Sequence, residues 1–265
     1  MVICPLCRKP LVQTPHSWHC EEDHSFDVAR QGYVNLLTVR QKHSLHPGDT
    51  KEMVLARREF LDAGYYTPIG ETLKRLVCQH SPQAQRVLDV GCGEGYYLSH
   101  LLHIPNRVGI DISKEAVRYA AGRYKDSLWL TATASHLPFA DHSFDCLLSM
   151  FALTMEEEFS RVLKPGGIFI QVLAGKNHLL GLKNIIYPTL IEKEKHLHRD
   201  LEGFSILHSE TISFDFALED SRQVQNLLSM TPHVWRISKE AAQTLNQTAA
   251  LRDRAEVVFN VYQSK

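Results

Sequence analysis

The stretch Arg86-Val87-Leu88-Asp89-Val90-Gly91-Cys92-Gly93-Glu94-Gly95 decides the fold, because an apolar strand ends here in a glycine-rich turn. Gly91, Gly93 and Gly95 let the backbone bend sharply and let a ligand approach without interference from a Cβ atom. We expect the turn to open a helix. Asp111 ends the next apolar strand, twenty residues beyond Gly91, where a carboxylate can hold both hydroxyls of a ribose. Together these features predict a nucleotide-type ligand.

The register of the glycines and the position of Asp89 distinguish two classes of ligand. A dinucleotide fingerprint reads G-x-G-x-x-G, whereas these glycines follow G-x-G-x-G, and Asp89 lies two residues before the first of them. A carboxylate at the mouth of the turn repels a pyrophosphate but suits an ammonium or a sulfonium group. The pattern therefore predicts S-adenosylmethionine as the ligand. The alternative is that Asp89 only caps the turn and Asp111 only starts a helix.

Alternating strands and helices follow the turn, which predicts an α/β fold with a parallel sheet and helices on both faces. Ser113 is the expected N-cap of one helix, and another helix is expected around 156–163. Before the turn we expect a helix around 53–61 and one with Thr67 as N-cap and Pro68 at its first position. The expected strands span residues 87–90, 107–112, 127–131, 144–150, 168–173, 204–207, 211–218 and 255–262.

The first forty residues contain a metal-binding pattern, Cys4-x2-Cys7-x12-Cys20-x3-His24. Two thiolates of a C-x2-C knuckle can share one cation, and a second pair returning on a hairpin completes the tetrahedron that Zn²⁺ prefers. Four protein ligands leave no position for a water, so we expect one structural zinc per chain. His16 and His19 compete for the fourth place, but His19 adjoins Cys20 and is poorly placed to share its metal. A segment with so few core residues needs such a metal to fold.

Charge and hydropathy limit the possible partners. The net charge is −1, with 29 Lys and Arg against 30 Asp and Glu, so any contact with nucleic acid has to come from a local patch. One candidate patch lies in 40–60 and another in 176–199, although a solvated face is the bland interpretation of either. No run approaches the ~18 apolar residues that span a bilayer, and no export signal is recognisable, so we expect a cytoplasmic protein. The basic residues concerned are Arg40, Lys42, Lys51, Arg57, Arg58, Lys176, Lys183, Lys193, Lys195 and Arg199, with His178, His196 and His198 beside the last five.

Four motifs resemble those of the class I S-adenosylmethionine-dependent methyltransferases. They are VLDVGCGEG, GIDIS, HLPFADHSFD and RVLKPGG, and they cover roughly Arg86 to Leu173. The resemblance implies a doubly wound, mostly parallel seven-stranded sheet with a small N-terminal zinc-binding β module. It also implies three parts of the chain: the zinc module at 1–39, a linker with helices at 40–80, and the methyltransferase domain at 81–265.

Further segments look like the bacterial large-subunit (23S) rRNA guanine-N1 methyltransferases, a family that includes a housekeeping enzyme and a macrolide-resistance relative. The segments are CPLC, HSFDVARQGYVNLL, PGDTKEMVLARREFLDAGYYTPI and MTPHVWR. The resemblance implies methylation of N1 of a guanine in an rRNA hairpin loop, carried out by a homodimer whose cleft accepts the hairpin. A small-molecule methyltransferase of the same fold and a non-catalytic RNA-binding or assembly protein are the alternatives.

The same resemblance assigns roles to individual residues. Tyr66, Gly93, Glu94 and His178 match positions that the family uses around its cofactor, and the four zinc-pattern residues match its zinc ligands. Thr133 stands where many superfamily members carry the acid that binds adenine, so no adenine ligand is named. The residue that removes the N1 proton is also left unnamed. Candidates lie in 151–154 and among Glu156, Glu157 and Glu158, although these glutamates also suit the first turn of a helix.

Overall fold

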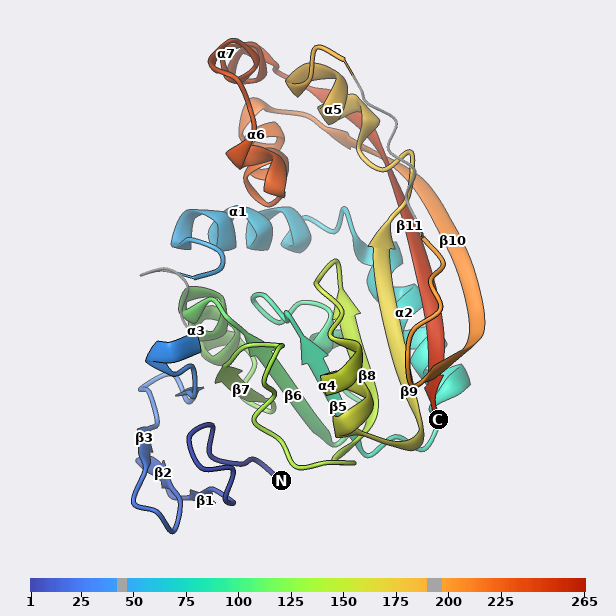
Figure 1. Cartoon of the computed structure of the whole chain (residues 1–265). Coiled ribbons are helices and arrows are strands. Elements are labelled where there is room, and N and C mark those ends of the chain that lie inside the picture. Colours follow the sequence, from blue (N-terminus) through green and yellow to red (C-terminus); the bar gives the residue numbers. More distant parts are fainter. Residues whose placement is uncertain (42–46, 190–196) are drawn as a thin grey trace.

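The main structural element is a mixed β-sheet (Figure 1) in the computed structural model, which describes residues 1–41, 47–189 and 197–265. Lys42, Lys193, Lys195 and His196, which we expected near RNA, lie outside the described residues. The sheet is built from β4 (Val34–Asn35), β5 (Arg86–Val90), β6 (Asn106–Asp111), β7 (Leu128–Thr131), β8 (Phe144–Met150), β9 (Leu163–Ala174), β10 (Phe204–Leu218) and β11 (Leu251–Ser264).

The strand order is β10-β11-β9-β8-β5-β6-β7-β4. Strands β4 to β9 pair in parallel, and the β10–β11 hairpin joins the sheet antiparallel to β9. The class I methyltransferase fold is therefore confirmed. The described sheet has one strand more than the seven expected, because β4 from the N-terminal segment extends it.

Both faces of the parallel part of the sheet are buried, as expected of parallel strands between helices. Neighbouring residues of β5 point to opposite sides, so Val87 lies in one hydrophobic core and Leu88 in the other. The first core also contains side chains of α2 (Thr67–His80), η2 (Leu98–His100) and α3 (Lys114–Arg123). The second contains Phe159 of α4 (Glu156–Val162) and Trp18 of the N-terminal segment.

The helix starts agree only in part with expectation. Ser113 is the N-cap of α3, and its hydroxyl accepts a hydrogen bond from the Ala116 amide. Tyr66, not Thr67, is the N-cap of α2, and Tyr66 makes no side-chain capping bond. Thr67 lies inside the helix because Tyr66 already adopts the non-helical backbone, with φ −107° and ψ 18°. The helix α1 (Lys51–Asp62) is capped by Thr50.

The prediction of a helix directly after the glycine-rich turn is wrong. Only the short 3-10 helix η2 forms there. Gly95 has a positive φ of 89°, which a right-handed helix does not contain, and its amide donates to the Cys92 carbonyl at 3.0 Å within the turn.

The C-terminal hairpin differs from expectation in one respect. The two strands expected at 204–207 and 211–218 form the single strand β10, whose register shifts between Ile206 and His208. A bulge of this kind absorbs the interruption in the apolar pattern. Between β10 and β11 lie α6 (Ser221–Ser229), η3 (Pro232–Trp235) and α7 (Lys239–Gln247), while α5 (Leu180–Ile186) follows β9.

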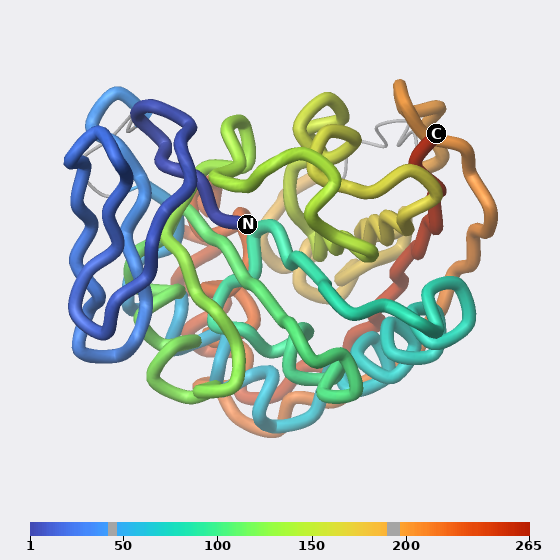
Figure 2. The backbone as a smooth tube through the Cα atoms, turned by 90° about the horizontal axis from the view of Figure 1, so that it is seen from below, coloured from blue at the N-terminus to red at the C-terminus, as the bar shows by residue number. Residues whose placement is uncertain are grey.

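The N-terminal segment forms a small antiparallel sheet at one end of the molecule, opposite the C-terminal hairpin (Figure 2). Its elements are β1 (Val12–Gln13), β2 (Ser17–His19) and β3 (Ser25–Asp27), followed after β4 by η1 (Val39–Gln41). Before β1, Val2 and Ile3 form only isolated bridges. Trp18 and Leu11 are buried in the second core, so this segment is stabilised partly by packing on the main domain.

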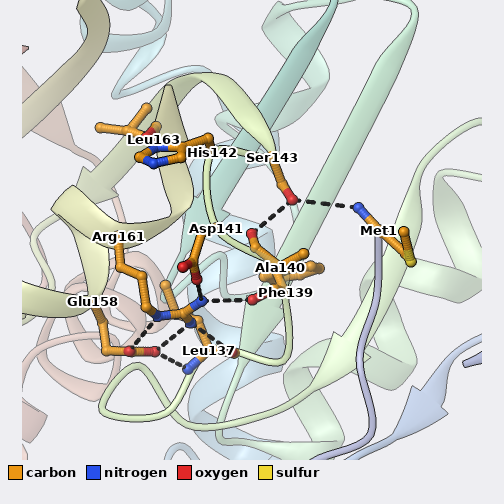
Figure 3. Close-up of polar contacts among 10 residues, drawn as sticks. All are labelled: Met1, Leu137, Phe139, Ala140, Asp141, His142, Ser143, Glu158, Arg161 and Leu163. Atoms are coloured by element: carbon orange, nitrogen blue, oxygen red, sulfur yellow. Dashed lines mark hydrogen bonds and ion pairs between the residues drawn. The ribbon is translucent and has the colours of Figure 1, made fainter. Parts of the chain in front are cut away.

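Arg161 connects α4 to the loop before β8 (Figure 3). Its guanidinium donates to both carboxylate oxygens of Glu158, at 2.7 and 2.9 Å, and to Asp141 at 2.8 Å. It also donates to the carbonyls of Phe139 and Leu137 at 2.7 and 3.0 Å. The HLPFADHSFD and RVLKPGG motifs are thus joined through one side chain. The N-terminal amine contacts the same loop through Ser143, 3.4 Å away.

We expect Arg161→Gln to lower the free energy of unfolding by about 2–3 kcal/mol, because Glu158 and two carbonyls lose a half-buried partner. Lys164→Gln is the matched control, since Lys164 makes an exposed pair with Asp145, and it should cost less than about 1 kcal/mol. Chemical denaturation measures both values. Equal losses in the two variants would contradict this role of Arg161.

Candidate functional site

The glycine-rich turn lies at the carboxyl end of β5, where its glycines are required by geometry. Gly91, Gly93 and Gly95 all have positive φ, at 78°, 56° and 89°. A Cβ on Gly95 would lie 2.5 Å from the Trp129 ring, and one on Gly91 would lie 2.7 Å from the Cβ of Ala152. The segment after β8 therefore packs directly on the turn. The amides of Gly91 and Cys92 both donate to the Ile110 carbonyl at 2.9 Å, which ties the turn to β6.

Asp111 lies beside the turn, as the sequence predicted. One carboxylate oxygen accepts from the Gly93 amide at 3.0 Å, and the other accepts from the Ser113 amide at 2.8 Å. Burial raises the pKa of Asp111, although these two amides oppose the shift. The carboxylate thus joins the turn to the start of α3. Each oxygen keeps a lone pair for a further donor.

Asp89 is buried behind the turn with no hydrogen-bond partner for either carboxylate oxygen. Only 1% of the residue is exposed. Burial, with Asp111 and Glu94 nearby, raises the pKa of Asp89 to about 8. Glu94 is also buried, and burial raises its pKa despite the nearby Arg57. An unpaired buried carboxylate is costly, so this group of acids fits a ligand that brings a positive group and hydrogen-bond donors.

Arg57 lies beside these acids and not on the basic face where we expected it. Its Nη1 is the atom nearest to the position that a Cβ on Gly93 would take, at 3.6 Å. The guanidinium forms an ion pair with Asp49 and donates to the Met230 carbonyl at 3.2 Å. Helix α1 buries one face that contains Met53, Ala56 and Phe60. Arg57 lies next to this face, so its side chain points toward the glycine-rich turn. Arg58, the other arginine of this expected face, forms an ion pair with Asp62 at 3.5 Å.

Tyr66 and His178 are 112 residues apart in the sequence, yet they meet. The Tyr66 hydroxyl lies 3.3 Å from His178 Nε2. The Glu256 amide donates to His178 Nδ1 at 3.3 Å, which places the ring proton on Nε2, where it can donate to Tyr66. Burial raises the pKa of Tyr66, and the negative charge of the nearby Asp253 raises it further, so this hydroxyl stays protonated.

Phe151 directly follows β8 and has an unusual backbone conformation, with a φ of 56°. Its ring centroid lies 6.0 Å from that of His178, at an interplanar angle of 31°, and 6.3 Å from that of Tyr97. The residue is 38% exposed, whereas the nearby Met150 and His178 are buried. Positive φ is costly for a bulky residue and is found disproportionately at functional sites. No local sequence signal indicates this conformation.

The glutamates considered as proton acceptors occupy the first turn of α4, which confirms the structural alternative. Glu158 accepts from Arg161 and from the Leu137 amide, and Glu156 accepts from the Glu202 amide at 2.7 Å. Arg199 of the expected basic loop also contacts Glu156. At the position considered for adenine, the hydroxyls of Thr133 and Ser135 lie 3.0 Å apart.

The predicted metal ligands converge. Their ligand atoms all lie within 4.8 Å of one another, and within the described ranges the cluster contains neither His16 nor His19. Cys7 Sγ lies 3.5 Å from Cys20 Sγ, and His24 Nδ1 lies 3.4 and 3.6 Å from the sulfurs of Cys20 and Cys4. Edges of about 3.5–3.8 Å are expected for a zinc tetrahedron with thiolate and imidazole ligands. The four residues therefore fit a closed structural zinc site.

Comparison with known proteins places this geometry in a family. Residues 2–45 match the family described as RlmA, N-terminal, a zinc ribbon, and residues 88–171 match the methyltransferase domain family. The 23S rRNA (guanine(748)-N(1))-methyltransferase of Streptomyces fradiae is 37% identical, over 88% of this chain and 85% of that protein. The chain belongs to the 23S rRNA (guanine-N(1)-)-methyltransferase family.

Two further comparisons agree with this assignment. A protein of Micromonospora griseorubida, named provisionally as a methyltransferase of the same kind, is 32% identical over 97% of this chain and 94% of its own length. A solved structure concerning conversion of a disulfide bond into a thioacetal group during echinomycin biosynthesis matches with a TM-score of 0.50. That match is 13% identical, covers 72% of this chain and 81% of the other, and shows the fold alone. Members of this family are S-adenosylmethionine-dependent methyltransferases with one structural zinc, and this chain carries both modules. Its described helices contain no segment long and apolar enough to cross a membrane.

We expect Cys7→Ser to release zinc and to unfold the segment containing β1 to β3, because the metal supplies folding free energy that this small sheet lacks. Elemental analysis and limited proteolysis measure the two effects. Cys78→Ser is the matched control, since Cys78 is exposed and outside the cluster. Wild-type protein purified without chelator and found free of zinc would refute the site.

Proposed function

We propose that this protein methylates N1 of a guanine in a hairpin loop of large-subunit (23S) rRNA, with S-adenosylmethionine as the methyl donor. The observation that carries the proposal is the unpaired, buried Asp89 behind the glycine-rich turn, in a chain that resembles guanine-N1 methyltransferases along most of its length. An rRNA substrate agrees with the cytoplasmic location that we expect from the sequence.

The cofactor would be held at the carboxyl edge of β5 and β6. Gly91, Gly93 and Gly95 leave room for it, and Asp111 can accept from the ribose hydroxyls through lone pairs that the Gly93 and Ser113 amides leave unused. Asp89 and Glu94 provide negative charge for its ammonium and sulfonium groups. Tyr66 and His178 form the wall of the site next to α2 and β11.

When bound, S-adenosylmethionine supplies a methyl group activated by its sulfonium. The residues of this chain then have to align a guanine with that methyl group and exclude water. We propose that Phe151 stacks on the target base, because its ring is exposed, lies beside His178 and is fixed by the packing of Ala152 on the turn. Exposure of this ring supports a large external substrate over the small-molecule alternative. The group that accepts the N1 proton is not assigned.

RNA affinity requires local charge, and the inward orientation of Arg57 removes one member of the expected patch. We propose that the zinc module and the segments around Arg40 and Lys176 contact the RNA backbone. We also propose that two chains form a homodimer whose cleft accepts the hairpin, as the family resemblance implies.

We expect the affinity for S-adenosylmethionine to rise with pH between about 6 and 8 and to fall above about pH 8, where the α-ammonium of the ligand loses its proton. Asp89 is protonated below about pH 8 in the free protein, and a cationic ligand favours its ionised form, so binding at lower pH has to release a proton. Calorimetry in buffers of different ionisation enthalpy detects this release. Asp89→Asn should reduce the rise in affinity between about pH 6 and 8, and a wild-type affinity that is flat across this range would contradict the role of Asp89.

The proposed reaction is tested by primer extension on 23S rRNA from a deletion strain, because N1-methylguanosine stops reverse transcriptase. The wild-type gene should restore a stop that the deletion removes. Phe151→Ala should slow methylation by about tenfold or more, since stacking is worth about 1–3 kcal/mol per base, and it should leave cofactor affinity unchanged. Leu153→Ala is the matched control, because Leu153 is also exposed. If the deletion removes no stop in 23S rRNA, the proposed substrate is wrong.

A further inference from the structure

The amino-acid end of S-adenosylmethionine carries two opposite charges, an ammonium and a carboxylate. The acidic residues beside the glycine-rich turn suit the ammonium and the sulfonium, but they repel the carboxylate. Asp89, Glu94 and Asp111 influence one another electrostatically, and Asp49 adds a fourth negative group nearby. A pocket that binds the whole zwitterion therefore needs a cation placed beside these acids.

Arg57 has the placement that such a cation requires. Its guanidinium is the nearest group to Gly93 on the side where a Cβ would point, and only 22% of its side chain is exposed. The charge of Arg57 acts on Glu94 and on Asp111. Helix α1, which carries Arg57, crosses above the carboxyl ends of the parallel strands (Figure 1).

Two contacts fix the guanidinium without using up its donors. Asp49 accepts from Nη1, and the Met230 carbonyl accepts from Nη2. Asp49 is itself held, because its carbonyl accepts from the Ser113 hydroxyl at 2.7 Å at the start of α3. Arginine has five N–H donors in a planar fork, so a guanidinium held in this way can still bind a carboxylate.

We infer that Arg57 is the residue that binds the carboxylate of S-adenosylmethionine. In this arrangement the acids of the turn bind the cationic groups of the ligand, and the arginine of α1 binds its anionic group. Asp49 and Met230 position the guanidinium. The inference concerns only the cofactor, so it stands or falls independently of the RNA substrate proposed above.

A competing explanation is that Arg57 only neutralises the surrounding carboxylates. Removing the arginine would then leave an uncompensated acidic pocket, and every cationic ligand would respond in the same way. Only direct contact with the ligand carboxylate makes the effect depend on whether the ligand has that group.

The test compares two ligands by calorimetry on the full-length, zinc-loaded protein. S-adenosylhomocysteine carries the ammonium and the carboxylate, whereas S-adenosyl-3-thiopropylamine keeps the ammonium and lacks the carboxylate. Arg57→Gln should weaken binding of S-adenosylhomocysteine by about tenfold or more, the usual effect of losing a charged hydrogen bond. The decarboxylated ligand should bind this variant as tightly as it binds wild type, or more tightly. Arg58→Gln, the adjacent exposed arginine, should change neither affinity.

Three results would overturn the inference: an equal change for both ligands, no change for either, or an effect of Arg58→Gln as large as that of Arg57→Gln. Thermal melts confirm that each variant is folded. If Arg57→Gln does not fold, Arg57→Lys replaces it, because it keeps the charge but loses the bidentate fork. That variant should weaken the binding of S-adenosylhomocysteine more than the binding of the decarboxylated ligand. An equal loss of affinity for both ligands would contradict the assignment.

Discussion

Buried carboxylates at the carboxyl edge of β5 and β6 are the constraint on which the rest of the site depends. Burial raises the pKa of Asp89, Glu94 and Asp111; in addition, the charges of Asp111 and Glu94 raise the pKa of Asp89, and the charge of Asp111 raises that of Glu94. Different neighbouring groups limit the free-energy cost of burying each carboxylate. Asp111 accepts two backbone amides, Glu94 lies near Arg57, and Asp89 has no hydrogen-bond partner. The parallel sheet is rigid enough to hold this imbalance, which a zwitterionic, largely cationic ligand relieves.

Much of this arrangement could be predicted from short-range pattern. The apolar runs located β5 to β9, because strands buried on both faces are nearly continuous in apolar residues. The spacing from Gly91 to Asp111 placed the acid beside the turn, since parallel neighbouring strands end at one edge. The Cys and His spacing identified the zinc cluster, because a knuckle and a hairpin leave few ways to form a tetrahedron.

Long-range contacts could not be predicted in this way. In the sequence, Arg57 is indistinguishable from other surface charges, because only the folded structure places α1 over the turn. Its partner Met230 is 173 residues away in the sequence. Tyr66 and His178 were identified by family resemblance, and nothing local shows that they touch. The missing helix after Gly95 and the positive φ of Phe151 depend on packing around the turn, where tertiary contacts override local propensity.

The pairing of β4 with β7 has a consequence for the protein's behaviour in concentrated solution. Val34 and Asn35 lie beside Leu130 and Thr131, so the last strand of the parallel series is covered by residues that follow the zinc cluster directly. Without this cover, β7 would present unpaired amides and carbonyls along the apolar sequence Leu-Trp-Leu-Thr, which is a template for strands of other molecules. Zinc, by holding the segment that contains β4, would therefore protect the protein against self-association. Removing the zinc with a chelator would lead to precipitation of a methyltransferase domain that is otherwise folded.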